Sequence, residues 1–276
     1  MKTLRAGLYK ILEKEHPMTV RQVFYQAVTR GLVGKTELEY NRAVMRLLIE
    51  LRRGGVIPFE WIVDNTRQVQ RLSTHDGVQD ALLAAADSYC RSLWSDTREV
   101  VAVWLEKDAL AGVLWEVVAQ YDVPLMVGRG YDSLTFKHDV SELFEAHGRD
   151  VFIYLFGDWD PSGKDISRVL ERDLREWAPN VKLTFERVAV TEKQIEEWSL
   201  PVRPTKHTDP RAKEFKGDSV ELDAIPPAEL RRLVTESISR HVDQDHLDEI
   251  RQTEAEDREA LRRIAEDYAG SMNQDP

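Results

Sequence analysis

Short apolar runs alternate with helical segments in the middle of the chain, and this alternation constrains the fold more than any other feature. The apolar runs cover 100–105, 123–127, 151–156 and 182–190. The segments between them, expected to be helical, cover 107–120, 133–147 and 162–177. Strands that alternate with helices form right-handed βαβ units around a parallel sheet. We therefore predict an α/β domain over residues 98–190, with functional groups at the carboxyl ends of its strands.

Three acidic residues stand where this architecture places functional groups. Glu106 directly follows the first strand, and Asp158 and Asp160 follow the third. Carboxylates that converge on one sheet edge repel each other unless a hard cation neutralises them, and oxygen ligands favour Mg²⁺ or Mn²⁺. We therefore expect these three residues to bind Mg²⁺ or Mn²⁺. The alternative is structural, with Asp158 as a turn residue and Asp160 as an N-cap before Pro161.

Two basic residues accompany these strand ends. Lys107 follows Glu106, and Arg129 lies in the turn 128–131 that closes the second strand. Glycines in such a turn let the backbone come close to a phosphate, with the arginine as the cation. We expect Arg129 to contact nucleic-acid phosphates, and Lys107 either to do the same or to balance the charge of the carboxylates. A plain tight turn and a surface lysine would explain the same residues without a ligand.

The first 73 residues have a different pattern, with three amphipathic segments followed by a short alternating stretch. The segments cover 1–15, 20–31 and 37–53, and residues 56–63 are predicted to form a hairpin. Three helices and a small β-wing are typical of a winged-helix module, whose third helix enters the major groove of DNA. We predict such a winged-helix-like module over 1–73, with a generic helical bundle as the alternative. The arginines expected to contact DNA from its third helix are Arg46, Arg52 and Arg53.

Charge is distributed unevenly along the chain. The net charge is −11, yet residues 1–73 hold 13 Lys and Arg against 7 Asp and Glu, and the rest hold 25 against 42. A basic front indicates contact with phosphate, although uneven surface charge explains the same counts. We further expect a connecting helix in 74–97. Over 191–276 we expect a polar loop and a helical, acidic C-terminal region.

Composition argues against membrane-spanning and disulfide-stabilised classes. No apolar run reaches the roughly 18 residues that a membrane span needs. The single cysteine, Cys90, rules out an internal disulfide and a cysteine-based zinc site. The first residues include Glu13 and Glu15 and lack the apolar core of a signal peptide. We therefore expect a soluble cytoplasmic protein.

Taken together, the strand-end motifs resemble those of a Toprim domain, most closely the version in the A subunit of topoisomerase VI and in the meiotic double-strand-break transesterases. That family has a glutamate in an E-K context after the first strand, which Glu106 matches. Its G-[KR]-G-[YF] and D-x-D-P-x-G motifs match 128–131 and 158–163. The family usually continues the first of these with Pro-Asp, where this chain has Asp132-Ser133. The resemblance covers roughly 17–190 and implies a Toprim domain, with a parallel Rossmann-like sheet, over 98–190.

The resemblance also implies a mechanism. The family's catalytic tyrosine lies in a T-x-R-x-[IVL]-[YF]-Y segment, which residues 19–25 match, and this implies that Tyr25 attacks a backbone phosphorus. Arg21 would stabilise the phosphate charge, and Glu106 would act as an acid or base besides binding the metal. Duplex DNA as substrate, a homodimer and a separate ATPase subunit for strand passage are implied as well.

Two other functions remain open from the sequence. Toprim domains also occur in nucleases that hydrolyse DNA or RNA with metal-activated water, and these form no covalent link between protein and nucleic acid. A non-catalytic winged-helix DNA-binding partner subunit with an inactive Toprim fold is the second alternative.

The position of Tyr25 on its helix bears on this choice. Phe24 and Tyr25 are adjacent, and adjacent helical residues point about 100° apart. We expect Phe24 to pack in the core and Tyr25 to face a groove, with Arg21 beside its hydroxyl group.

Overall fold

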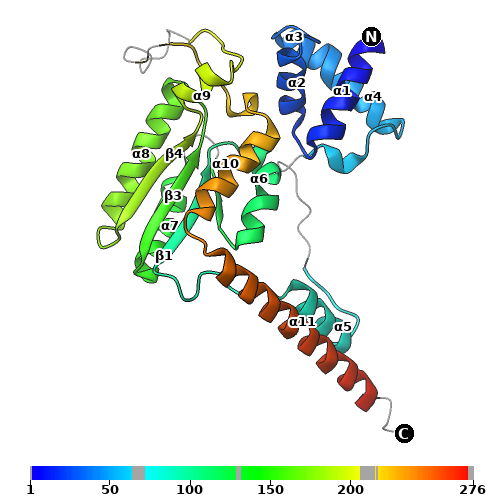
Figure 1. Ribbon diagram of the computed structural model, residues 1–276, viewed down its shortest axis with the longest axis vertical. Coiled ribbons are helices and arrows are strands. Elements are labelled where there is room, and N and C mark those ends of the chain that lie inside the picture. Colours follow the sequence, from blue (N-terminus) through cyan, green and yellow to red (C-terminus); the bar gives the residue numbers. More distant parts are fainter. Residues whose placement is uncertain (1, 64–71, 129–131, 206–214, 216, 273–276) are drawn as a thin grey trace. The chain divides into compact units, whose positions relative to one another are not determined.

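The chain folds into two units in a computed structural model that describes residues 2–63, 72–128, 132–205, 215 and 217–272 (Figure 1). The larger unit combines residues 1–67 with 98–238. The smaller unit combines 68–97 with 239–276. Each unit is therefore built from two separate stretches of the sequence.

A four-stranded parallel sheet forms the centre of the larger unit. Its strands are β1 (Glu99–Leu105), β2 (Leu125–Val127), β3 (Asp150–Phe156) and β4 (Leu183–Ala189). They lie in the order β2-β1-β3-β4, and every neighbouring pair is parallel. The prediction of an α/β domain with a parallel sheet is therefore confirmed.

The strand order fixes where a ligand site can form. The crossover helices are α6 (Ala111–Val118), α7 (Leu134–His147) and α8 (Pro161–Trp177). The chain first moves outward from β1 to β2 and then returns past β1 to β3 and β4. Because each crossover is right-handed, α6 lies on one face of the sheet, and α7 and α8 lie on the other. The direction reverses between β1 and β3, and ligands bind at such a switch point.

The face under α7 and α8 carries the main hydrophobic cluster. Side chains of both helices pack there on alternate residues of β1 and β3, because successive strand residues point to opposite faces. The fully enclosed members of this cluster include Ala102, Phe144, Val151, Ile153 and Leu174.

Helices dominate the first residues of the chain. They are α1 (Lys2–Glu15), α2 (Val20–Thr29), α3 (Glu37–Glu39), a π-helical turn (Tyr40–Met45) and α4 (Arg46–Arg53). Thr19 begins α2 with a capping box, in which its hydroxyl accepts from the N–H of Gln22 and the Gln22 side chain accepts from the N–H of Thr19. The predicted third helix is a continuous helical run in three parts.

The hairpin predicted over 56–63 is wrong. Residues Phe59–Trp61 form a 3-10 turn, and Ile62 makes an isolated parallel bridge with Met18. Pro58 has no N–H for a strand ladder, and Ile57 and Ile62 are buried in the helical core instead. The described part of the front module is thus helical, without the β-wing of a winged helix up to residue 63.

After the sheet, the chain returns across its carboxyl edge. Helix α9 (Glu192–Glu197) is followed by bridges that pair Arg203 with Ser219 and Trp159 with Val220. A 3-10 turn (Leu222–Ala224) and α10 (Pro227–Ser239) follow. This return brings residues 203 and 219–223 next to the loop after β3.

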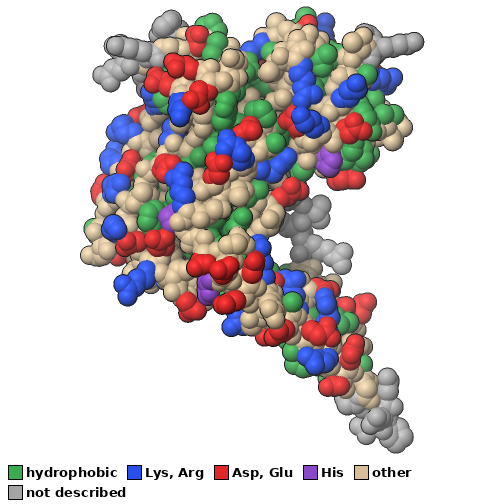
Figure 2. Space-filling model, viewed as in Figure 1, with side chains coloured by type: hydrophobic (Ala, Val, Ile, Leu, Met, Phe, Trp, Pro, Cys, Tyr) green, Lys and Arg blue, Asp and Glu red, His purple; other side chains and the backbone are tan. Residues whose placement is uncertain are grey.

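The smaller unit is a pair of helices, α5 (Val78–Ser88) and α11 (Gln244–Met272). The two helices pack against each other, Ala86 and Ala265 are buried, and the Tyr89 hydroxyl donates to Asp257 at 2.9 Å. Acidic and basic side chains mix along the surface of α11 (Figure 2). No helix in the described part of the chain is both long and apolar enough to cross a membrane.

Candidate functional site

Glu106 and Asp158 meet at the switch point of the sheet. Glu106 directly follows β1, and Asp158 comes two residues after β3, whose Phe156 pairs with Leu105. The backbone N–H of Asp158 donates to Glu106 Oε2 at 3.1 Å. The N–H of Leu222 donates to Asp158 Oδ1 at 2.8 Å. The structure thus brings two of the three predicted carboxylates, Glu106 and Asp158, together at the carboxyl edge of the sheet.

The pKa values of both carboxyl groups are raised by their surroundings. Burial and the charge of Asp158 raise the pKa of Glu106 to about 7. Burial also raises the pKa of Asp158, although Lys107 and the Leu222 N–H partly oppose this effect. Two neighbouring, partly buried carboxylates with raised pKa values are an arrangement that a bound cation stabilises.

The space around this pair fits a small cation. A Cβ at Gly157 would run into the Glu106 carboxylate, and a Cβ at Gly163 would run into the backbone of Asp158. Glu106 Oε1 and Asp158 Oδ2 form no hydrogen bond with any described residue. Mg²⁺ is commonly held by one or two carboxylates and several waters. The donor set therefore fits Mg²⁺ or Mn²⁺ at Glu106 and Asp158.

Asp160 has a different environment from the other two. Its Oδ1 caps α8 by accepting from the N–H of Gly163 at 2.8 Å, and its Oδ2 accepts from Arg203 at 3.3 Å. The three predicted ligands do not have ligand atoms that all lie within 4.8 Å of one another. In the described part of the chain that condition is met by an exposed group on α7, namely His138, Asp139 and Glu142. Asp160 thus holds Arg203 and the start of α8.

Arg187 holds the loop that carries these residues. Its guanidinium donates to the carbonyl oxygens of Gly157 and Asp158 at 3.2 Å and to that of Gly163 at 2.8 Å. Burial lowers the pKa of Arg187, while the nearby carboxylates, Glu106 first, raise it. This arginine is a positioning residue, because it acts on the backbone between the carboxylates.

The sequence did not point to Glu221, which is the centre of a second cluster beside this pair. Glu221 accepts from Arg21 at 3.3 and 3.4 Å, from Lys107 at 3.3 Å and from Arg203 at 3.1 Å. Burial by itself would raise the pKa of Glu221, but these cations, Lys107 and Arg21 first, lower it to about 2. Lys107 also forms an ion pair with the buried Asp223. Glu221 therefore joins α2 to the carboxyl edge of the sheet within one chain.

A weak signal for this cluster exists in the sequence. In residues 219–225 apolar residues alternate with Ser219, Glu221 and Asp223, and all three polar residues are buried. Acidic residues are almost never fully buried unless they are paired. Their partners Arg21 and Lys107 lie 200 and 114 residues away, so the sequence alone does not identify them.

Tyr25 does not face a groove, and that prediction is wrong. Tyr25 is 2% exposed and Phe24 is 3% exposed. The Tyr25 ring lies 5.2 Å from the amine of Lys35 and 6.0 Å from the guanidinium of Arg21, so the expected neighbour is present. Burial and the charge of Glu221 raise the pKa of the Tyr25 hydroxyl well above its usual value. The hydroxyl is therefore a poor nucleophile in this arrangement.

The arginines predicted to contact DNA differ in their surroundings. Arg46 pairs with Glu50 at 3.1 Å, and Arg52 lies over the Phe59 ring at 4.6 Å while it donates to the Phe59 carbonyl. Arg53 is exposed at the end of α4. All three lie on α4, as predicted. Arg129 lies outside the described residues.

The comparisons with known proteins add no relative. A scan of the chain against protein-family models found no match, and a search of curated proteins found none either.

Proposed function

We propose that this protein cleaves phosphodiester bonds of nucleic acid with the help of a divalent cation held by Glu106 and Asp158. One observation carries the proposal. Two partly buried carboxylates, each with an oxygen free of hydrogen bonds among the described residues, stand at the switch point of a parallel sheet. Mg²⁺ or Mn²⁺ at this position would supply polarisation of a phosphate oxygen.

The chain's own residues contribute acid–base chemistry and positive charge. With a pKa of about 7, the Glu106 carboxyl can take or give a proton near neutral pH. Arg187 keeps Glu106 and Asp158 at a fixed separation by holding the loop 157–163. Lys107 and Arg203 bring cations to the same edge, where a phosphate diester would need them.

Water is favoured over Tyr25 as the nucleophile. Tyr25 is enclosed, and its pKa is raised by burial and by Glu221. Of the two cleaving functions open from the sequence, hydrolysis by a Toprim-like nuclease is therefore the one we propose. A homodimer and a separate ATPase subunit remain predictions of the resemblance.

Transesterification by Tyr25 is the second candidate, and one observation favours it. Arg21 lies beside the Tyr25 ring and shares Glu221 with Lys107, the residue after Glu106. The tyrosine and the candidate metal site therefore belong to one connected network of a single chain.

Tyr25→Phe separates the two candidates. If water is the nucleophile, the Tyr25 hydroxyl takes no part in the reaction. The variant, which lacks only that oxygen, should then cleave DNA in Mg²⁺ or Mn²⁺ at the wild-type rate. Denaturing gels run before and after protease digestion should show no protein-linked DNA for either protein. Loss of cleavage in Tyr25→Phe, together with a covalent adduct in the wild type, would establish transesterification instead.

The front module should supply salt-dependent binding to duplex DNA. Replacing Arg46, Arg52 and Arg53 together by Ala should weaken binding for all sequences alike. The slope of log affinity against log salt should fall by about 2 to 3, since each phosphate contact contributes about 0.9. Fluorescence anisotropy at several salt concentrations measures this slope.

A matched triple substitution controls for net charge. Three exposed arginines outside the front module can be replaced by Ala in the same way, namely Arg168, Arg232 and Arg262. An equal loss of slope in this control would show that α4 has no special role.

A further inference from the structure

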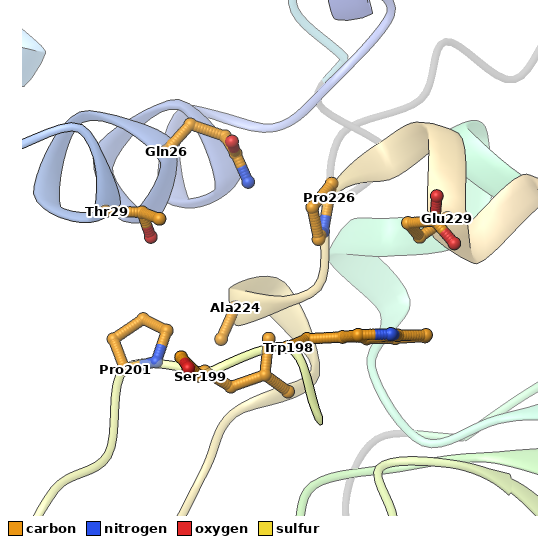
Figure 3. Close-up of a pocket in the computed structure, with 9 residues that line it drawn as sticks. Gln26, Thr29, Trp198, Ser199, Pro201, Ala224, Pro226 and Glu229 are labelled. Carbon is orange, nitrogen blue, oxygen red and sulfur yellow. The ribbon is translucent and has the colours of Figure 1, made fainter. Parts of the chain in front are cut away.

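A cavity of about 230 Å³ opens beside the carboxyl-terminal half of α2 (Figure 3). It is lined by Gln26 and Thr29 of α2, by residues 198–201 after α9, and by Ala224 and Pro226 before α10. A cavity of about 150 Å³ already admits a benzene ring. This one therefore has room for a single planar heterocycle.

Gln26 points to the chemistry of the occupant. The residue is only 5% exposed, and its side-chain amide forms no hydrogen bond with any described residue. Figure 3 shows the amide directed from α2 toward the cavity. Because Gln26 lines the cavity, its amide is accessible from there, and a ligand or water in the cavity can satisfy it. Since an amide offers a donor next to an acceptor, it matches the edge of a nucleobase, which presents the same pair.

Trp198 provides a surface for stacking. Figure 3 shows its indole ring edge-on, so that one face is turned toward Pro226 and Glu229 across the open space. Pro201 and Ala224 complete a largely apolar wall. A flat aromatic face with an apolar surround is how proteins hold an unpaired base, largely without regard to its sequence context.

The charges at the rim favour a ligand that carries phosphate. The amine of Lys35 donates to the carbonyl oxygen of Pro201 at 2.9 Å, so a cation stands at the cavity wall. Glu229, the acid in the lining, is paired with Arg232 at 2.8 Å. Arg203 lies two residues beyond Pro201 and belongs to the Glu221 cluster. Because Arg203 is already paired with Glu221 and Asp160, the Lys35 amine is the cation that a strand backbone would meet at this wall.

We propose that this cavity binds one unpaired nucleobase of a nucleic-acid strand, stacked on Trp198 and hydrogen-bonded by Gln26. The inference rests on the proposed function, because it assumes that nucleic acid lies along the adjoining site. It adds that the substrate is held at a base that is single-stranded or turned out of a duplex.

The test uses the full chain and a short single-stranded oligodeoxynucleotide with one 2-aminopurine, in EDTA so that no cleavage occurs. Stacking on Trp198 should quench the 2-aminopurine fluorescence, and an oligonucleotide with an abasic site at that position should bind about tenfold more weakly.

Trp198→Ala should weaken binding of the 2-aminopurine strand by a similar factor. Gln26→Leu, which keeps the side-chain size and the fold, should reduce both affinity and quenching. Trp115→Ala, at a tryptophan 58% exposed on α6, is the matched control and should change neither.

The outcomes distinguish the cavity from the proposed function. If both oligonucleotides bind equally well and Trp198→Ala and Gln26→Leu have no effect, the nucleobase proposal is overturned while nucleic-acid binding stands. If neither oligonucleotide binds, and duplex DNA does not bind either, the proposed function fails and the cavity proposal fails with it.

Discussion

Replacing Glu106 by Gln is expected to abolish cleavage of nucleic acid and, at the same time, to raise the melting temperature of the metal-free protein at pH 8. The loss of a metal ligand and acid–base group should reduce the cleavage rate by about 10² to 10⁴. The gain in stability follows from the raised pKa. Glu106 titrates near 7 in the folded chain and near 4.5 in the unfolded chain, so the folded state binds more protons between these values. Stability therefore falls as the pH rises through this window.

Glutamine removes this penalty while it keeps an oxygen that accepts from the Asp158 N–H. We expect a gain of about 3 kcal/mol at pH 8, equivalent to about 6–12 °C, and no gain below pH 4.5, where both forms are neutral. Thermal melts with and without Mg²⁺ measure the effect. Mg²⁺ should stabilise the wild type but not Glu106→Gln.

Glu142→Gln is the matched control, because Glu142 belongs to the exposed acidic group on α7. It should leave cleavage, metal response and metal-free stability unchanged. If Glu142→Gln removed the metal response and Glu106→Gln did not, the metal site would have to be moved from the sheet edge to α7.

Replacing Glu221 by Gln should produce the largest loss of stability in the molecule's polar network. The substitution leaves Arg21, Lys107 and Arg203 without their shared carboxylate, and removing one partner of a buried ion pair typically costs about 3–5 kcal/mol. A pKa lowered from 4.5 to about 2 corresponds to about 3 kcal/mol at neutral pH. We therefore expect the melting temperature to fall by about 6–12 °C at pH 7.

The loss of stability in Glu221→Gln should depend on pH in a definite direction. Glu221 has a pKa of about 2 in the folded chain and of about 4.5 in the unfolded chain. The stability that its charge contributes is therefore fully present above pH 4.5. The contribution is lost as the pH falls toward 2. The difference in urea midpoint between wild type and Glu221→Gln should thus be constant from pH 6 to pH 8 and shrink below pH 4.5.

Glu37→Gln provides the comparison. Glu37 also accepts from Arg21, at 3.3 Å, but its side chain is 71% exposed. Exposed ion pairs contribute about 0–1 kcal/mol, so this variant should melt close to the wild type. Equal losses in the two variants would contradict a special role for Glu221.

The sheet could be predicted from the sequence because each of its strands is determined by residues that are close together in the chain. Each strand is an apolar run of a few residues, and the rules for parallel sheets then place Glu106 and Asp158 at one edge. The start of the second helix was also predicted from the sequence, at residue 20, where α2 begins. These features depend on neighbours within a few positions along the chain.

The wing, the exposure of Tyr25 and the Glu221 cluster could not be predicted, because they depend on distant contacts. Ile62 pairs with Met18 instead of forming a hairpin. Tyr25 is covered by Lys35 and lies near Glu221, which is about 200 residues away in the chain. From the sequence, Asp160 could be either a metal ligand or the N-cap of a helix. Its contacts with Gly163 and Arg203, which the sequence does not show, favour the N-cap.

The pairing of α5 with α11 has a consequence for synthesis of the chain. Tyr89 and Asp257 are 168 residues apart, and the whole of the sheet is translated between them. While the ribosome makes the sheet, α5 has no partner for its alanine-rich side, because α11 has yet to be synthesised. Contacts of such long separation form slowly and late. The smaller unit should therefore be the last part of the protein to fold, and a nascent chain arrested before α11 should carry α5 as a protease-sensitive segment inside an otherwise folded domain.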